Sequence, residues 1–264
     1  MTVYTDLVRY RELFANLFRR DFQAKYKGSA LGVLWSLLNP LVLLGVYLLV
    51  FGVVFPNPTP HYAIYVLSGL ASWTFFATSL QTSARSLIDS ADLIKKVRFP
   101  RQLVALSMVG TQAVTYAILT GILIVLSLVL LPSARPWVWL VLPLGVLFLL
   151  EVVGIALIAA CLNVLFRDVE HVVAAALLPW FFVTPIIWNN ATLGARADRH
   201  HLLLTVLHWV NPVAPPIFAM RDAIWSGHAP HLWDVVYLAV AAAIALGLGA
   251  LVFRSVDDRI AVEL

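Results

Sequence analysis

Residues 9–40 read RYRELFANLFRRDFQAKYKGSALGVLWSLLNP, and this stretch decides the fold. Six Lys and Arg residues lie before Gly28, and after Lys27 no charged residue follows until Arg85. A basic flank that runs into a long uncharged, apolar segment is typical of a chain entering a membrane, and such flanks stay in the cytosol. We therefore expect the N-terminus to lie on the cytosolic side of a membrane.

The composition also predicts an integral membrane protein. The 264 residues are 61% hydrophobic and 12% charged, whereas soluble domains contain about 25% charged residues. The net charge of +4 does not indicate a nucleic-acid partner, because the basic residues lie beside apolar segments, as membrane flanks do. The single cysteine, Cys161, excludes a disulfide within the chain.

Six segments are apolar and long enough to cross a bilayer, for which a helix needs roughly 20 residues. They are 31–55, 62–84, 104–131, 137–166, 172–188 and 235–253. The predicted fold is therefore an all-α integral membrane protein with a six-span domain over 31–264 and both termini in the cytosol. Predicted cytosolic segments contain 14 of the Lys and Arg residues and predicted outer segments contain four, which supports this orientation.

The region 189–231 contains two short apolar runs, 202–210 and 217–225, separated by the sequence NPVAPP at 211–216. Each run is about half as long as a membrane crossing requires. Such runs indicate two outer re-entrant half-helices, which are tolerated where protein or water covers their backbone. The alternative is an ordinary amphipathic external loop.

Residues 1–30 predict an amphipathic helix at the membrane surface. Apolar side chains recur there at helical spacing, at Leu7, Tyr10, Phe14 and Leu17. Such a helix lies in the membrane interface and turns its cations toward lipid headgroups or a partner protein. The candidate interface cations are Arg19, Arg20, Lys25 and Lys27. A simple membrane anchor is the alternative.

The segment between the second and third spans predicts a short cytosolic helix. Asp89 or Ser90 is suited to cap its start, and Pro100 ends it. Its mixed charges favour docking into a groove of another protein over an ordinary basic loop. The candidate docking residues are Asp89, Asp92, Leu93, Ile94, Lys95, Lys96 and Arg98.

Polar and aromatic side chains inside the predicted spans are candidates to line a channel. Aromatic faces suit a sugar pathway, while helix packing and lipid contact explain each single residue equally well. The candidates are Tyr47, Phe51, Phe55, Ser72, Ser79, Trp180 and Phe181. A stripe of small residues in the last span, Ala241, Ala245 and Gly249, is expected at a close helix contact.

Glu151 is the one carboxylate well inside a predicted span. An ionisable group at such a position is a candidate functional group, and a proton-driven carrier would depend on it. The spans offer it no second acid, Lys or His for a proton relay, so we assign it no catalytic role.

Motifs for nucleotide and metal binding are missing from the sequence. It contains no G-x-x-x-x-G-K-[ST] phosphate loop, no H-E-x-x-H pair and no cysteine pair. We therefore expect no catalytic residues, no metal site and no cofactor in this chain.

Five segments match one family pattern in order. They are DFQAKYKGSALGVLWSLLNP (21–40), DLIKKVRFPRQL (92–103), LNVLFRDVEHV (162–172), TPIIW (184–188) and NPVAPPIFAMRDAI (211–224). Together they resemble the ABC-2 type transporter permeases, and within them the bacterial exporters of O-antigen, teichoic acid and capsular polysaccharide. The resemblance covers nearly the whole chain.

The resemblance implies a transport subunit rather than an enzyme. Two copies would form the pore in the bacterial plasma membrane, and each would bind a separate cytosolic ATPase subunit that holds ATP and Mg. Residues 89–98 would be the helix that couples to the ATPase, and the half-helices would shape the outer exit. The implied cargo is a polysaccharide on a polyprenyl-diphosphate carrier, whose diphosphate the basic flank at Arg19, Arg20, Lys25 and Lys27 would attract.

Besides a proton-driven secondary carrier, which would depend on Glu151, two other functions stay open at this point. One is an ABC-2 exporter of drugs or small molecules. The other is a membrane enzyme that acts on polyprenyl lipids, for which Asp89 and Asp92, three residues apart on one helix face, are the candidate acidic pair.

Overall fold

The computed structural model describes residues 9–29, 32, 34–54, 59–97, 99–194 and 198–263. Within these ranges the chain is helical and contains no strand. Five of its helices are long and apolar enough to cross a membrane, and a bent helix pair makes a sixth if it is taken as one span. The prediction of an all-α protein with several membrane-spanning helices is confirmed.

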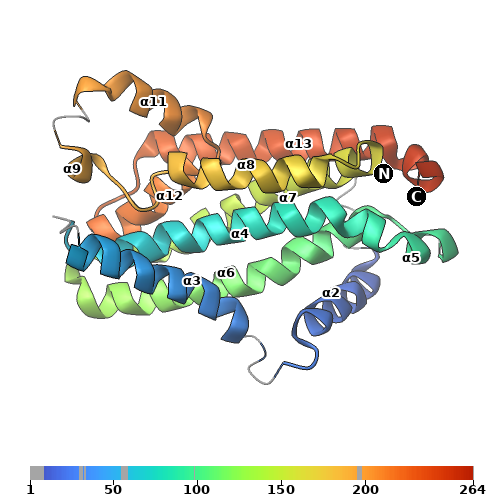
Figure 1. The fold of residues 1–264 in the computed structure, drawn as a ribbon, viewed down its shortest axis with the longest axis horizontal. Helices are drawn as coiled ribbons and strands as arrows, with labels where there is room; N and C mark the ends of the chain where they lie inside the picture. Colours follow the sequence, from blue (N-terminus) through green and yellow to red (C-terminus); the bar gives the residue numbers. More distant parts are fainter. Residues whose placement is uncertain are drawn as a thin grey trace.

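The long helices run side by side along the long axis of the molecule (Figure 1). They cover the first four predicted spans and the last, and the final helix continues beyond its predicted end at residue 253 to Glu263. They are α3 (Leu34–Leu48) with the π-helical turn η1 (Leu49–Val54), α4 (Tyr62–Asp89), α6 (Gln102–Leu130), α7 (Val141–Leu165) and α13 (Leu232–Glu263). Two short 3-10 turns, η2 (Pro132–Ala134) and η3 (Val138–Leu140), connect α6 to α7.

The prediction that residues 172–188 form one membrane-spanning helix is wrong. Helix α8 covers Val169–Val183, and the chain continues to Trp188 without helical structure. The cause is Pro185, which disfavours the helical conformation of the residue before it. Thr184 accordingly has φ −75° and ψ 134°. A helix of 15 residues is about 22 Å long, which is shorter than a bilayer core.

The two predicted half-helices are present. Helix α11 (His201–Val210) and helix α12 (Ala214–Arg221), which continues as the π-helical turn η4 (Asp222–Ser226), meet at an angle of 99°. The break is shorter than predicted, because Pro215 and Pro216 belong to the first turn of α12. Proline is tolerated there since the first helical N–H groups have no partner within the helix. A short helix, α9 (Asn190–Leu193), precedes α11.

One end of the bundle gathers the N-terminal helix α2 (Arg11–Tyr26), the short helix α5 (Ala91–Lys96) and the last turns of α13 (Figure 1). Their apolar residues share one buried cluster, to which Leu17, Ile94 and Phe253 belong. The half-helices α11 and α12 lie at the other end. This arrangement is what the predicted topology requires, since the segments predicted to be cytosolic lie together and apart from the predicted outer region.

Helix α2 packs against the bundle. Its rings form a ladder four residues apart, Phe14, Phe18, Phe22 and Tyr26, with centroids 5.1–6.4 Å apart. The ladder lies on α6, where a methyl group at Gly110 would approach Phe18 to 3.3 Å. The predicted helix is therefore present, and part of its apolar face contacts protein.

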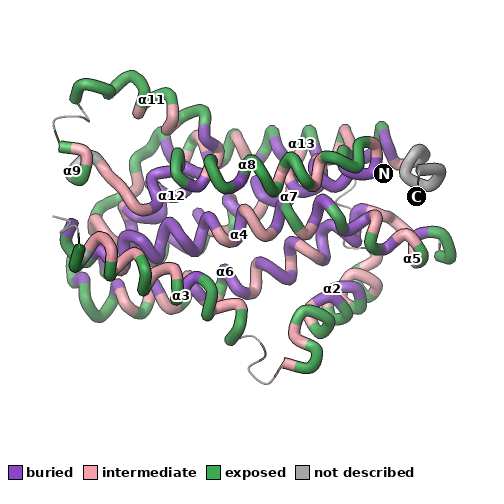
Figure 2. Tube along the Cα trace, viewed as in Figure 1, coloured by how far each residue is buried: buried purple, intermediate pink, exposed green. Residues whose placement is uncertain are grey.

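Helix α4 is the central element, and α3, α8 and α11 lie at the surface (Figure 2). Of the apolar window in α4, 78% is buried, compared with 11% in α3. Helix α13 packs along α7 at small residues, where any side chain at Gly154 would collide with the backbone of Ala245. Ala245 and Gly249 therefore form the close helix contact that the small-residue stripe predicts.

Candidate functional site

The segment predicted to dock onto a partner forms helix α5, directly after α4. Its residues Asp92, Lys95 and Lys96 are exposed, Leu93 is half-buried and Ile94 is buried in the cluster shared with α2. The two apolar residues therefore attach α5 to the bundle, and the charged residues form its solvent-exposed side. Val97, which the sequence analysis did not select, is 50% exposed and adds an apolar group to this surface. Arg98 lies outside the described residues.

Ion pairs tie this end of the bundle together. Nε of Arg85 on α4 lies 3.5 Å from Oε2 of Glu170 on α8. The same atom lies 3.9 Å from Oδ2 of Asp89, one turn further along α4. Arg101, just before α6, lies 2.9 Å from Asp257 on α13. These pairs link α8 to α4 and α13 to the start of α6, next to the two ends of α5.

The predicted interface cations divide between two hollows. Arg19, Arg20 and Lys27 line an open hollow of about 840 Å³ beside α2 and the chain that follows it. Arg20 also forms a 2.7 Å ion pair with Asp21. The carboxylate of Asp21 is buried and accepts a 2.6 Å hydrogen bond from Ser107 on α6, which fixes α2 in place.

Lys25 points to the other side of α2. Its Nζ donates a hydrogen bond of 2.8 Å to Oε1 of Gln112 on α6. The hydroxyl groups of Tyr26 and Ser36 are 2.6 Å apart at the same place. Lys25 therefore lies at one end of a second hollow, of about 310 Å³, between α3, α4 and α6.

A third hollow, of about 360 Å³, continues the second one toward α8. The two share a polar face that consists of Asn39 on α3 and Thr74, Thr78 and Gln81 on α4. Thr74, Thr78 and Gln81 follow each other at helical spacing, so they face one side of α4. We call the two hollows together the polar groove.

Aromatic rings close the far end of the polar groove. Tyr47 on α3 and Phe181 on α8 are stacked with their ring centroids 6.1 Å apart, and both line the groove. Trp73 lies 5.7 Å from Phe181 and completes the cluster. The groove thus combines hydroxyl and amide groups with aromatic rings, since Trp35, Phe75 and Tyr116 line its other half.

Of the predicted channel residues, Tyr47 and Phe181 line the polar groove. Phe51 packs against Tyr62, and Trp180 donates a 2.9 Å hydrogen bond to Asn211 between α8 and α12. Ser72 and Ser79 are buried within the bundle. Phe55 lies outside the described residues.

The predicted channel residues did not include the polar residues of the groove, Asn39, Thr74, Thr78 and Gln81. Their signal was present, because Thr74, Thr78 and Gln81 are polar, lie in an apolar span and are spaced four and three residues apart. Spacing alone does not tell this face of α4 from the neighbouring stripe at Ser72 and Ser79, which packs against other helices.

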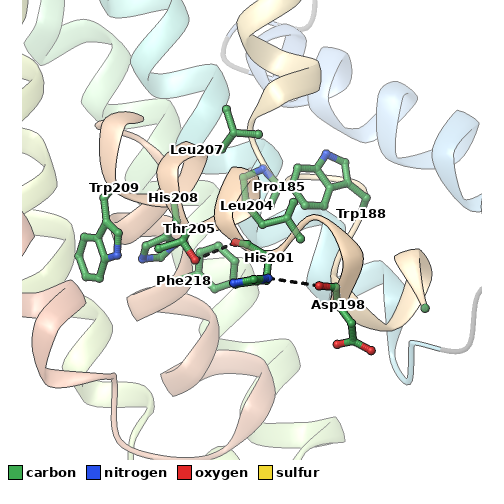
Figure 3. A pocket seen from close by; sticks show the side chains of 11 residues that line it. Pro185, Trp188, Asp198, His201, Leu204, Thr205, Leu207, His208, Trp209 and Phe218 are labelled. Atoms are coloured by element: carbon green, nitrogen blue, oxygen red, sulfur yellow. Dashed lines mark hydrogen bonds between the residues drawn. The ribbon is translucent and has the colours of Figure 1, made fainter. Parts of the chain in front are cut away.

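A separate pocket of about 570 Å³ lies beneath α11 at the predicted outer end (Figure 3). Pro185 and Trp188, from the non-helical segment after α8, and Phe218 on α12 form one side of it. On α11, His208 Nε2 lies 2.7 Å from a carboxylate oxygen of Asp234 at the start of α13. This pair attaches α11, none of whose residues is buried, to α13.

Glu151 lies buried on α7, and the candidate acidic pair is divided between the end of α4 (Asp89) and α5 (Asp92). Glu151 is 2% exposed, and its Oε2 atom has no hydrogen-bond partner in the described part of the chain. Asp89 faces Arg85 of its own helix. Within the described residues there is no group of three or more His, Cys, Asp or Glu that would hold a metal ion.

A short helix with exposed charges at one end of a membrane bundle and a groove along the spans are compatible with a transport subunit. The family model of the ABC-2 type transporter matches residues 12–225, which is most of the chain. This chain belongs to the ABC-2 type transporter family. The resemblance inferred from the sequence motifs is confirmed.

Curated relatives of this ABC-2 permease include polysaccharide transport proteins. The O-antigen export system permease protein RfbA of Myxococcus xanthus is 30% identical over 260 residues, which cover 97% of this chain and 96% of that protein. A protein of the same name from Klebsiella pneumoniae is 30% identical over 82% of this chain and 81% of its own length. The polysialic acid transport protein KpsM of Escherichia coli is 22% identical over 92% of both chains.

Family membership settles the general role of the chain. It is a multi-pass membrane protein and a transport permease rather than an enzyme. An ABC-2 permease implies an ABC ATPase as its partner.

Proposed function

We propose that this permease exports a polysaccharide carried on polyprenyl diphosphate from the bacterial cytoplasm. The observation that carries the proposal is the polar groove, in which a polar face of α4 leads to the stacked pair Tyr47 and Phe181. Hydroxyl and amide side chains can exchange hydrogen bonds with sugar hydroxyls, and aromatic rings pack on apolar sugar faces. The relatives named for O-antigen and polysialic acid support the same class of cargo.

The polar face of the groove suits a glycan, while apolar and aromatic side chains form the rest of its lining. Here Asn39, Thr74, Thr78 and Gln81 line both halves of the groove. When a glycan displaces water from such a lining, little free energy is lost, because its hydroxyl groups replace the hydrogen bonds that the side chains made to water.

The hollow beside α2 is proposed to receive the diphosphate of the lipid carrier. Arg19, Arg20 and Lys27 line it together, and the basic flank to which they belong precedes the first apolar span. Basic side chains at a membrane surface attract anionic headgroups by about 1 kcal/mol each. Lys25, at the end of the polar groove, would then guide the same group toward α3 and α4.

A second copy of the chain is proposed to cover the polar groove. Helix α3 exposes a row of large apolar side chains, among them Leu38, Val42 and Val46, and α8 exposes Leu178 and Phe182. These residues flank the groove, so two copies that meet on this face would enclose a channel between them. A closed dimer with the same face on both subunits is the commonest arrangement of identical chains.

The ATPase is proposed to contact α5 through Asp92, Lys95, Lys96 and Val97, on the cytosolic side where both termini would also lie. ATP, bound by the ATPase together with Mg, would stabilise one of two arrangements of the complex. The ion pairs Arg85–Glu170 and Arg101–Asp257 link the ends of the helices around α5. They would carry that change from α5 into the membrane spans.

The test reverses charges in the hollow beside α2. Arg19→Glu with Lys27→Glu leaves the Arg20–Asp21 ion pair intact. We expect export of the lipid-linked glycan per assembled complex to fall about tenfold or more, because two attractive charges become repulsive. ATPase co-purification should be unchanged.

The matched control is Arg9→Glu with Arg11→Glu, which changes the charge of the same segment equally but away from the hollow. If both double variants reduce export alike, the hollow has no special role. If Arg19→Glu with Lys27→Glu instead abolishes ATPase co-purification, these cations belong to the ATPase contact.

A further inference from the structure

The non-helical segment after α8 poses a problem for a membrane protein. Residues 185–188 are not helical, so their backbone carbonyls lack the hydrogen bonds that a helix would provide. An unpaired carbonyl in a membrane interior costs several kcal/mol. In this chain, side chains of other helices donate to all four of these carbonyls. Arg221 donates to those of Pro185 and Ile186, Tyr62 to that of Ile187, and Tyr65 to that of Trp188.

Arg221 on α12 is the centre of this arrangement. It is 2% exposed, and its guanidinium lies 3.6 Å from the ring centroid of Tyr65 on α4. Arginine has five N–H donors, and five hydrogen bonds leave this side chain. Nε donates to Ser68 Oγ, Nη1 to Tyr65 Oη and to the carbonyl of Pro185, and Nη2 to the carbonyls of Tyr65 and Ile186.

No carboxylate lies among these acceptors, so the bonds of Arg221 do not form an ion pair. Its partners come from two places, α4 and the segment 185–188. A planar group with five donors is suited to this task, because it satisfies two backbone segments at fixed angles at once. A lysine at this position would supply three donors on one nitrogen.

Gly69 provides the space for the guanidinium. A methyl group at this position would lie 2.5 Å from Nη2 of Arg221 and 3.2 Å from the Cα atom of Ile186. Either the arginine or the segment would have to move to accommodate it. The glycine on α4, the arginine on α12 and the carbonyls of 185–188 therefore fit one another.

We propose that Arg221 is the positioning residue that holds α12 and the segment 185–188 on α4 as one rigid unit at the outer end of the permease. Pro185, Trp188 and Phe218, which form one side of the pocket beneath α11 (Figure 3), belong to this unit. Helix α11 does not, since the bend of 99° separates it from α12 and none of its residues is buried. The proposal rests on the proposed function only in taking this end as the outer one.

The experiment follows a buried thiol on α12 in membranes that contain the permease with its ATPase. Ala219 is 0% exposed, and Ala219→Cys in a Cys161→Ala background serves as the reporter. Native Cys161, also 0% exposed and located on α7, is followed in the chain without the reporter as a measure of general unfolding. N-ethylmaleimide, which crosses membranes, is the probe for both thiols.

We expect Arg221→Met to raise the labelling rate of the reporter about tenfold or more, because α12 then opens locally. Cys161 should stay protected, the ATPase should still co-purify, and export per complex should fall. Arg221→Lys should give an intermediate labelling rate, since it keeps the charge with fewer donors. Gly69→Ala should act like Arg221→Met, whereas Gly247→Ala, where no atom lies within 4 Å of the added methyl group, should act like the native chain.

The proposal is overturned if Arg221→Met leaves the reporter protected, or if it exposes the reporter and Cys161 to the same extent. If Arg221→Met does not accumulate in membranes, Arg221→Lys and Gly69→Ala decide by the same two criteria. The labelling result does not depend on the cargo. Failure of the native complex to export a glycan would therefore overturn the proposed function and leave the positioning role of Arg221 standing.

Discussion

Pro185 shows how one residue changes an entire span. It excludes Thr184 from the helical conformation, α8 ends at Val183, and four carbonyls then need donors from elsewhere. The sequence contains the segment with these carbonyls in the motif TPIIW and the donor Arg221 in the motif NPVAPPIFAMRDAI. Their pairing is invisible in the sequence, because the distance between the two motifs along the chain says nothing about their hydrogen bonds.

Close helix approach is the second feature decided by single residues. Gly154 lies against the backbone of Ala245, so Gly154→Ala should force α7 and α13 apart. Overpacking of this kind costs about 1–3 kcal/mol, and we expect a lower apparent melting temperature in detergent. Gly121→Ala is the matched control, since no atom lies within 4 Å of its added methyl group.

Alanine also favours a helix over glycine by about 1 kcal/mol. The control Gly121→Ala should therefore leave the melting temperature unchanged or raise it. Equal losses for Gly154→Ala and Gly121→Ala would show that the contact between α7 and α13 is not as close as described.

At the scale of elements, α2 is attached to α6 by a specific bond and not by its apolar face alone. Removing the hydroxyl group in Ser107→Ala leaves the buried Asp21 carboxylate with fewer donors, which costs about 1.5–3 kcal/mol for a bond to a charged group. We expect a double-mutant cycle of Ser107→Ala and Asp21→Ala, measured by thermal unfolding, to give a coupling of about 0.5–3 kcal/mol. Strictly additive effects would mean that this bond does not hold α2.

The exposed charges of α5 allow a separate prediction at this scale. Lys95→Glu with Lys96→Glu changes exposed residues, so the fold of the permease should survive. The ATPase should no longer co-purify, because the charges of its proposed docking surface are reversed. Arg135→Glu, a charge reversal at the other end of the bundle, is the control and should leave the complex intact. Retained co-purification with both lysines reversed would place the ATPase contact elsewhere.

The elements differ in how well the sequence predicts them. Long apolar runs determine the spans well, because the cost of unpaired backbone in lipid leaves helices as the solution. Boundaries that depend on proline are less certain, since Pro185 breaks a helix while Pro215 and Pro216 begin one. The candidate site is predicted only in part, as spacing identifies a face of α4 but not the helix that the face meets.

At the scale of the whole molecule, α3 and α8 expose apolar side chains beside the polar groove. We propose that a second copy of the chain covers this face. Val42 on α3 and Ile244 on α13 are similarly exposed, at 54% and 55%. In a Cys161→Ala background, Val42→Cys should form a disulfide-linked dimer under mild oxidation, whereas Ile244→Cys, on a face expected to contact lipid, should not. Equal cross-linking at both positions would contradict the proposed arrangement.

Export by the reconstituted complex tests the account most directly. Proteoliposomes would contain the permease and its ATPase, with a polyprenyl-diphosphate-linked glycan on the side of the ATPase, and a glycosidase or lectin would detect glycan on the opposite side. We predict that glycan appears there only with ATP and Mg, and that Lys95→Glu with Lys96→Glu abolishes its appearance. ATP hydrolysis by a stable complex without movement of the glycan, or glycan movement without the ATPase, would contradict the account.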